Sequence, residues 1–178
     1  MVFRIEFAPE LPRAVSRKTH GSAGNFDIDL PLAGAGGIEC RTGGASDAHQ
    51  IVIEFPAAVT FVDAAVTSGT GNVSNTSGNG TVEVTINLSG VTNAQTVTLT
   101  LFGVNDGTNT NDVAVPMSIL AGDTTADGSV NASDISQTKS QSGQAVARSN
   151  FRTDVTVKGF INNSDIGLAK SNSGSGLP

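Results

Sequence analysis

Two stretches near the C-terminus of the chain repeat one another, and this duplication limits what the last third of the chain can form. The first copy starts at Asp123 and the second at Asp154, an offset of 31 residues. The matching positions are Asp123, Gly128, Asn131, Ser133, Asp134, Ile135, Lys139, Ser140, Ser142 and Gly143 in the first copy, and Asp154, Gly159, Asn162, Ser164, Asp165, Ile166, Lys170, Ser171, Ser173 and Gly174 in the second. Repeats of this size are supersecondary units that bury their apolar faces against one another. We therefore expect a separate module of two similar units over residues 121–178.

Each copy opens with a pattern that suits calcium. Calcium takes roughly six to eight oxygen ligands, and a loop of about twelve residues supplies them from positions 1, 3, 5, 7, 9 and 12, with glycine at position 6. The expected ligands of the first loop are Asp123, Thr125, Asp127, the carbonyl of Ser129, Asn131 and Asp134, with Gly128 at the turn. The sequence therefore predicts a calcium site in the first loop.

The second loop departs from this pattern at position 5, where Lys158 replaces the carboxylate. Its candidate ligands are Asp154, Thr156, the carbonyl of Phe160, Asn162 and Asp165. A lysine ammonium among these ligands repels a divalent cation and can itself neutralise the carboxylates. Two alternatives remain open: a weakened metal site, or a loop that is held by an internal ion pair without metal.

A short helix is expected after each loop, over residues 134–140 and 165–171. Each segment has an acidic residue in its first turn and a lysine near its end, which complements the helix dipole. Val130, at position 8, is expected to pair with its counterpart in the second loop. Phe151 is expected to pack between the two copies.

This duplicated loop and helix resembles a type I dockerin over residues 122–174, in particular the dockerin-like tails of bacterial secreted and surface proteins. The resemblance implies calcium as the cofactor, an extracellular or cell-surface location, and a protein partner that is a cohesin-like domain or another copy of the chain. It also implies partner contacts at loop positions 10 and 11 and on the helices. Those positions are Ala132, Ser133, Lys139, Asn163, Ser164 and Lys170. The alternative is that these residues simply face solvent.

Strand patterns dominate the chain before the duplication. Residues 81–88 place Val82, Val84, Ile86 and Leu88 on one face, as a half-buried strand requires. Strands are expected at residues 26–30, 37–40, 50–55, 60–66, 81–88, 96–102 and 113–120, with loops at residues 68–80 and 105–112. This spacing predicts a mainly β fold with an antiparallel β-sandwich over residues 22–120, resembling a cohesin-like or immunoglobulin-like body.

Residues 1–21 are expected to form an extended N-terminal arm, since Pro9 and Pro12 interrupt the segment. An alternating stretch at its start carries the apolar residues Val2, Phe3, Ile5 and Phe7. Two alternatives are open for this stretch. It could add a strand to a neighbouring subunit, or it is a frayed terminus or a strand of its own sheet.

Composition narrows the functional classes. The net charge is −6 and no run of Lys and Arg could follow a phosphate backbone, so nucleic acid is not an expected partner. No apolar run reaches the roughly 18 residues of a membrane helix, so membrane insertion is not expected. Only two histidines occur, and neither lies in a catalytic motif, so we expect no enzyme activity.

The sequence therefore predicts a non-catalytic, extracellular, calcium-binding structural or assembly protein. A subunit of a filament joined by its N-terminal strand is one alternative. A glycan-binding module anchored by the dockerin-like tail is another, although the chain contains neither Trp nor Tyr for sugar rings to stack upon.

Overall fold

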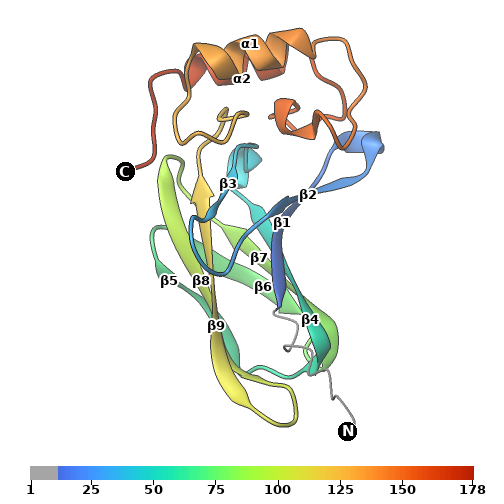
Figure 1. Ribbon diagram of the computed structural model, residues 1–178, viewed down its shortest axis with the longest axis vertical. Helices are drawn as coiled ribbons and strands as arrows, with labels where there is room; N and C mark the ends of the chain where they lie inside the picture. Colours follow the sequence, from blue (N-terminus) through green and yellow to red (C-terminus); the bar gives the residue numbers. More distant parts are fainter. Residues whose placement is uncertain (1–11) are drawn as a thin grey trace, which may run out of the picture.

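A computed structural model describes residues 12–178 of the chain. It has two parts, a pair of β-sheets and a helical module that lies across one end of them (Figure 1). The predicted strand-donating residues Val2, Phe3, Ile5 and Phe7 lie outside the described residues.

The mainly β class predicted from the sequence is confirmed, and the strands form two sheets. The first sheet has the order β2-β1-β4-β7-β6, with β2 at Asn25–Asp29, β1 at Arg13–Thr19, β4 at His49–Val59, β7 at Thr81–Ser89 and β6 at Asn72–Ser77. The second has the order β3-β9-β8-β5, with β3 at Gly37–Glu39, β9 at Thr110–Ile119, β8 at Gln95–Asn105 and β5 at Asp63–Ser68.

The core lies between the two sheets and follows the alternation of the strands. In β7, Val84, Ile86 and Leu88 are buried, as the pattern predicted, whereas Val82 at the strand end is 52% exposed. The partner side chains come from β4 in the same sheet and from β8 and β9 in the other, among them Ile51, Ile53, Leu99, Leu101, Val115 and Met117. Burial of these apolar side chains is the main favourable term that holds the sheets together.

The extended arm predicted for residues 1–21 is wrong for its second half. Residues 13–19 form β1, which lies inside the first sheet and pairs antiparallel with both β2 and β4. Ala14 and Val15 are buried in the core, while Arg13 and Arg17 bind Asp29 and Asp27 across the strand pair. The charged side chains of Arg13 and Arg17 made this segment resemble a solvated arm in the sequence, because the acidic residues that neutralise them are distant in sequence.

The expectation of a purely antiparallel sandwich is also wrong in one place. β3 pairs parallel with β9, with Gly37 opposite Met117 and Glu39 opposite Ile119. The second sheet is therefore mixed. β3 places Glu39 and the following Arg41 at the end of the sandwich that faces the module.

The module carries two helices, α1 at Ala132–Ser140 and α2 at Asn163–Ser171. They lie side by side as the outermost layer, with their loops turned toward the sheets (Figure 1). Both predicted helices are confirmed but begin two residues earlier, because Asn131 and Asn162 act as the N-caps. Among residues 12–178, no helix has the length and apolar character needed to cross a membrane.

Candidate functional site

The first loop, residues 123–134, brings three carboxylates together. Asp123, Asp127 and Asp134 each offer an oxygen, and these oxygens all lie within 4.8 Å of one another. Asp123 and Asp134 are fully buried, whereas Asp127 is exposed. Three carboxylates that converge from one short loop could hold a cation, and oxygen donors of this type suit calcium.

Backbone amides fix Asp123 at the start of this loop. Its Oδ2 accepts the N–H of Gly128 at 2.9 Å, and its Oδ1 accepts the N–H of Asp127 at 3.2 Å. Gly128 has a φ of +85°, a conformation that other residues rarely adopt. The glycine at position 6 therefore turns the chain so that its amide points back at the first ligand.

Asp134 is fixed at the other end of the loop by the start of α1. Asn131 and Asp134 form a capping box, in which the Asn131 side chain accepts the N–H of Ser133 and Asp134 accepts the N–H of Asn131 at 2.9 Å. The N–H and hydroxyl of Thr125 also donate to Asp134, at 3.0 and 2.9 Å. The same hydroxyl lies 3.4 Å from Asp123, so Thr125 stands between the two buried ligands, as expected of position 3.

The electrostatics of the loop favour a positive charge. Burial raises the pKa of Asp123, and the neighbouring charge of Asp134 raises it further, against the backbone amides that lower it. Burial also acts to raise the pKa of Asp134, but hydrogen bonds from Asn131 and Thr125 outweigh it, so this pKa is lowered. A divalent cation would relieve the repulsion between the two carboxylates, and the residues present therefore fit calcium.

Position 7 and position 8 lie on short backbone pairings that join one copy to the end of the other. Ser129 forms a bridge with Gly176, and Val130 accepts from Gly174 and donates to Ser175. In the second loop, Phe160 bridges to Ala145 and Ile161 accepts from Gly143. The backbone of each position 8 therefore pairs with the segment that follows the other copy's helix. The expected pairing of the apolar Val130 side chain with its counterpart Ile161 stays a prediction, and both side chains are buried.

The second loop, residues 154–165, repeats the cage of the first. Asp154 accepts the N–H groups of Lys158 and Gly159, and Asp165 accepts those of Thr156 and Asn162. The side chains of Lys158 and Phe160 are exposed, and the internal ion pair that was one of the two alternatives for this loop is not among those formed within residues 12–178. Across the same residues, the first loop is the one place where three or more potential metal-binding side chains converge.

A histidine of the sandwich forms a further hydrogen bond with the carboxylate of Asp154. Nδ1 of His20 lies 2.8 Å from Oδ2 of Asp154, and both side chains are fully buried. Nη1 of Arg41 lies 3.1 Å from Nε2 of His20. Since a guanidinium can only donate, the hydrogen-bond network places the imidazole proton on Nδ1, from which it is donated to Asp154.

Arg41 links this contact to the sandwich, and all five of its guanidinium N–H groups have partners. Besides His20, they are the carbonyls of Ser16 and Phe26 and both carboxylate oxygens of Glu39, at 2.7 and 2.8 Å. The Ser16 hydroxyl donates to Glu39 as well. We call His20, Glu39, Arg41 and Asp154 the joint, because they form one buried chain of contacts from the sheets to the second loop.

The joint holds its acidic groups in the charged form. Burial acts to raise the pKa of Glu39, but the charge and hydrogen bonds of Arg41 outweigh it and lower this pKa to about 2. For Asp154, burial is outweighed by the His20 hydrogen bond and by the backbone amides, and its pKa is lowered. Hydrogen bonds to charged groups in a buried setting are stronger than neutral ones. The second loop is therefore strongly tied to the sandwich through Asp154.

Phe151 and Arg152 seal the same interface. The Phe151 ring stacks on Phe26 with centroids 5.4 Å apart, and Arg41 lies 5.5 Å from its centroid. Arg152 donates to the carbonyls of Ile38, Asp123 and Thr124. The prediction that Phe151 packs between the two copies is therefore wrong, since the ring packs against the sandwich.

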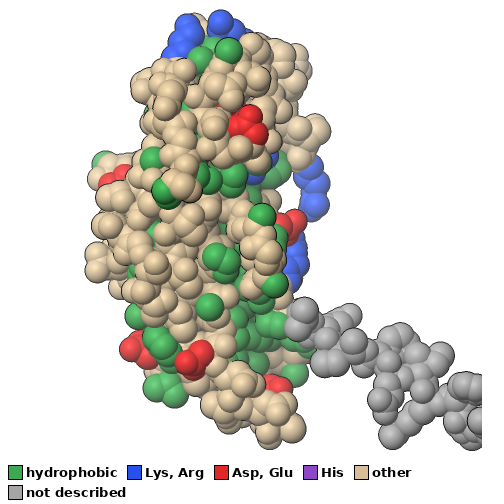
Figure 2. Space-filling model, turned by 60° about the vertical axis from the view of Figure 1, so that its left-hand side comes forward, with side chains coloured by type: hydrophobic (Ala, Val, Ile, Leu, Met, Phe, Trp, Pro, Cys, Tyr) green, Lys and Arg blue, Asp and Glu red, His purple; other side chains and the backbone are tan. Residues whose placement is uncertain are grey.

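The residues predicted to contact a partner all lie on the outer side of the module. Ala132, Ser133, Lys139, Asn163, Ser164 and Lys170 are all exposed. Lys and Arg side chains gather over the two helices at the top of the molecule (Figure 2). None of the six takes part in the joint, so this face is free to meet another molecule.

No protein-family model, curated protein or solved structure matches the chain. Its function must be inferred from the geometry of its own residues.

Proposed function

We propose that the protein is a non-catalytic, extracellular, calcium-binding structural or assembly module that acts through protein contacts. The observation that carries this proposal is the convergence of Asp123, Asp127 and Asp134 within 4.8 Å in a loop already shaped by backbone amides. Preorganised ligands of this kind bind calcium without a costly rearrangement of the loop.

The proposed partner surface is the outer face of α1 and α2. The duplicated loop and helix supports a dockerin-like mode of contact, in which a cohesin-like domain or a second copy of the chain meets Ala132 and Ser133, or Asn163 and Ser164, beside Lys139 or Lys170. All six side chains are exposed and occupy equivalent places in the two copies. Either copy could then present the same contacts to a partner.

In this proposal the joint fixes the module against the sandwich, so that the module is not a freely tethered tail. A module fixed by fully buried contacts between His20 and Asp154 presents its helices in one orientation at the end of the sandwich. In this proposal calcium orders the first loop, while the joint orders the second. A metal ion would thus stabilise the first loop, and protein side chains would stabilise the equivalent loop of the second copy.

Calcium binding is tested by titration calorimetry together with thermal unfolding. We expect one calcium ion per chain, with a dissociation constant of about 10⁻⁴ to 10⁻³ M, and a higher unfolding temperature when calcium is in excess. Asp127→Asn should weaken binding at least tenfold, because it removes one of the three negative charges that converge on the site. Asp127 is exposed and lies outside the capping box, so the substitution should leave the fold of the loop intact.

The control is Asp63→Asn, which alters a carboxylate at the start of β5, far from the loop in sequence and outside the metal cluster. It should leave calcium binding unchanged. Absence of any calcium binding by the unmodified chain would overturn the proposal.

A second candidate function, a filament subunit, is favoured by an open sheet edge. β3 covers β9 only at residues 117–119, so within the described part of the chain residues 110–116 have no strand partner on that side. An apolar groove of about 360 Å³, lined by Phe55, Val59 and Val113, lies beside this edge. In this alternative, Val2, Phe3, Ile5 and Phe7 of a second copy would add a strand there.

The filament alternative predicts that deleting residues 1–11 abolishes assembly. The deletion must end before Arg13, because β1 is a central strand and its loss would unfold the first sheet. Light scattering in millimolar calcium and in chelator gives the mass of each form. A large assembly that only the deletion dissolves supports the filament, whereas a monomer in every condition supports a separate protein partner.

A further inference from the structure

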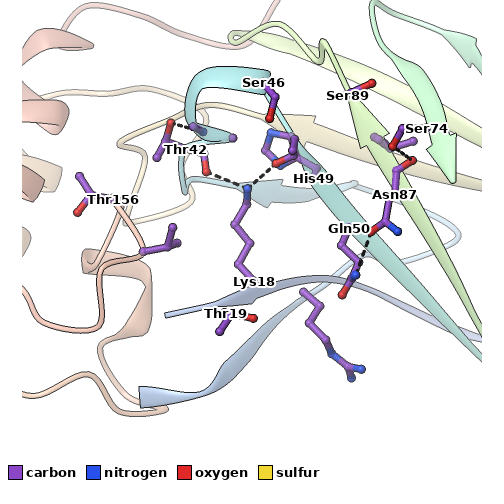
Figure 3. A pocket seen from close by; sticks show the side chains of 16 residues that line it. Lys18, Thr19, Thr42, Ser46, His49, Gln50, Ser74, Asn87, Ser89 and Thr156 are labelled. Carbon is purple, nitrogen blue, oxygen red and sulfur yellow. Dashed lines mark hydrogen bonds between the residues drawn. The ribbon is translucent and has the colours of Figure 1, made fainter. Parts of the chain in front are cut away.

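A polar groove of about 570 Å³ lies where the first sheet meets the module, outside the metal loop and the joint. Its walls come from β1, β4, β6 and β7, from the loop that includes Thr42 and Ser46, and from Thr156 and Val157 of the second loop. Figure 3 shows Lys18, His49, Gln50 and Asn87 around the opening. The groove is therefore complete only when the module is seated on the sandwich.

Lys18 supplies a fixed positive charge in this groove. Its ammonium donates to the carbonyls of Thr42 and Ala48, at 2.8 Å each, which leaves one of its three N–H groups for a ligand (Figure 3). Burial lowers the pKa of Lys18 to about 8, so the ammonium remains mainly charged at neutral pH. The two carbonyls hold the charge in one position.

The second observation that points to a ligand is the unsatisfied imidazole of His49. The imidazole is 4% exposed and lines the groove, and its Nδ1, which is itself buried, has no hydrogen-bond partner among residues 12–178. Buried polar atoms in folded proteins nearly always have partners, and an exception needs an explanation. Burial, together with the nearby charge of Lys18, lowers the pKa of His49 to about 4, so the ring is neutral at pH 7. A neutral ring can both donate to a ligand and accept from it.

The rest of the lining fits hydroxyl groups. Gln50 and Asn87 present amides, which are bonded to each other at 2.9 Å, and Ser46 and Ser89 present hydroxyls, whereas the Thr19 hydroxyl already donates to Asn25. Within the described part of the chain, the lining contains Arg17 and Lys18 but no Asp or Glu. A ligand with several hydroxyls and one negative group would satisfy these donors and acceptors, whereas a cation would find no counter-charge.

We propose that this groove binds a carboxylated saccharide, a hexuronate unit of an acidic polysaccharide, with the carboxylate on Lys18 and ring hydroxyls on His49 and the Gln50–Asn87 pair. Among the described residues no Phe ring lines the groove, so recognition depends on hydrogen bonds and charge. Such sites are weak for a single sugar, and we expect a dissociation constant on the order of 1 mM. This inference goes beyond the calcium-dependent assembly role and does not depend on it.

The test uses nuclear magnetic resonance of the histidine rings in the full chain. The chain contains only His20 and His49, so two sets of ring signals are expected. A hexuronate oligosaccharide should shift the His49 signals in a saturable way and leave those of His20 unchanged, because His20 is enclosed in the joint. A neutral hexose oligosaccharide of the same linkage should bind at least tenfold more weakly.

Two variants and one control locate the effect. Lys18→Met should abolish the preference for the acidic sugar, and Asn87→Ala should weaken binding several-fold while leaving the Lys18 contacts to the loop intact. Thr67→Ala, on the exposed side of the second sheet, should change nothing. Absence of a His49 shift would overturn the proposal, as would equal binding of inorganic sulfate, which would mean that the site recognises an anion alone. Repeating the titration in chelator separates this result from the calcium proposal.

Discussion

Replacing Glu39 by Gln should lower the free energy of unfolding by about 3 kcal/mol or more. The substitution keeps the shape of the side chain but removes the negative charge that faces Arg41, and both side chains are fully buried. A buried charge that loses its partner typically costs roughly 3–5 kcal/mol, far more than the net value of the intact pair. Chemical denaturation at pH 7 measures the change.

An exposed ion pair supplies the control. Arg13 and Asp29 are also within hydrogen-bond distance, but their side chains are 55% and 72% exposed. Asp29→Asn should therefore cost less than about 1 kcal/mol, the usual value of a solvated pair. Equal losses in Glu39→Gln and Asp29→Asn would mean that the buried pair is not what stabilises the end of the sandwich.

The same residue should give the protein a distinct acid sensitivity. The pKa of Glu39 is lowered from 4.5 to about 2 in the folded chain, so the unfolded chain binds the proton more readily. The stabilisation by Glu39 is then fully present above about pH 4.5 and is lost as the pH falls toward 2. The difference in stability between the unmodified chain and Glu39→Gln should shrink over this range, as measured by denaturation at pH 5, 4 and 3.

The duplication could be interpreted from sequence because its chemistry is local. Asp123, Gly128, Asn131 and Asp134 act on atoms within the same loop, so their spacing alone predicts the turn, the cap and the convergence of carboxylates. The helices and most strands were predicted for the same reason, since the periodicity of apolar residues reports which face is buried.

β6 shows where that reasoning fails. Its sequence, residues 72–77, is polar apart from Val73 and predicts a loop, yet it pairs with β7 along the edge of the sheet. An edge strand that buries little has no hydrophobic alternation to reveal it. Its formation depends on the neighbouring strand and on the tight turn at residues 78–80, where Gly78 and Gly80 have positive φ.

The joint could not be predicted because its members are distant in sequence. His20, Arg41 and Asp154 come from a loop after β1, the end of β3 and the second repeat, and no spacing connects them. In the sequence, Glu39 lies in a predicted strand and Arg41 precedes two glycines, so neither residue by itself indicates a buried ion pair. The one available signal was that these two opposite charges are two residues apart, which places them on the same face of a strand.

The largest contrast between the two loops should appear at their first position. Asp154→Asn removes the charge that binds His20 and should lower the free energy of unfolding by about 2–3 kcal/mol, whether calcium or chelator is present. Amide exchange should then accelerate in residues 121–178, while the core strands keep their protection. Asp123→Asn, the matched change in the first loop, should destabilise only in calcium, by about 2.7 kcal/mol when calcium is 100-fold above its dissociation constant.

The two variants distinguish a metal site from a structural contact because calcium should change the effect of Asp123→Asn on stability but not the effect of Asp154→Asn. In chelator, Asp123→Asn should leave stability unchanged or raise it slightly, since it removes a buried charge and its repulsion by Asp134, the two causes that raise the pKa of Asp123. If Asp154→Asn were destabilising only in calcium, the second loop would be a metal site and His20 a bystander. If Asp123→Asn were equally harmful in chelator, its carboxylate would serve the fold of the loop and not a cation.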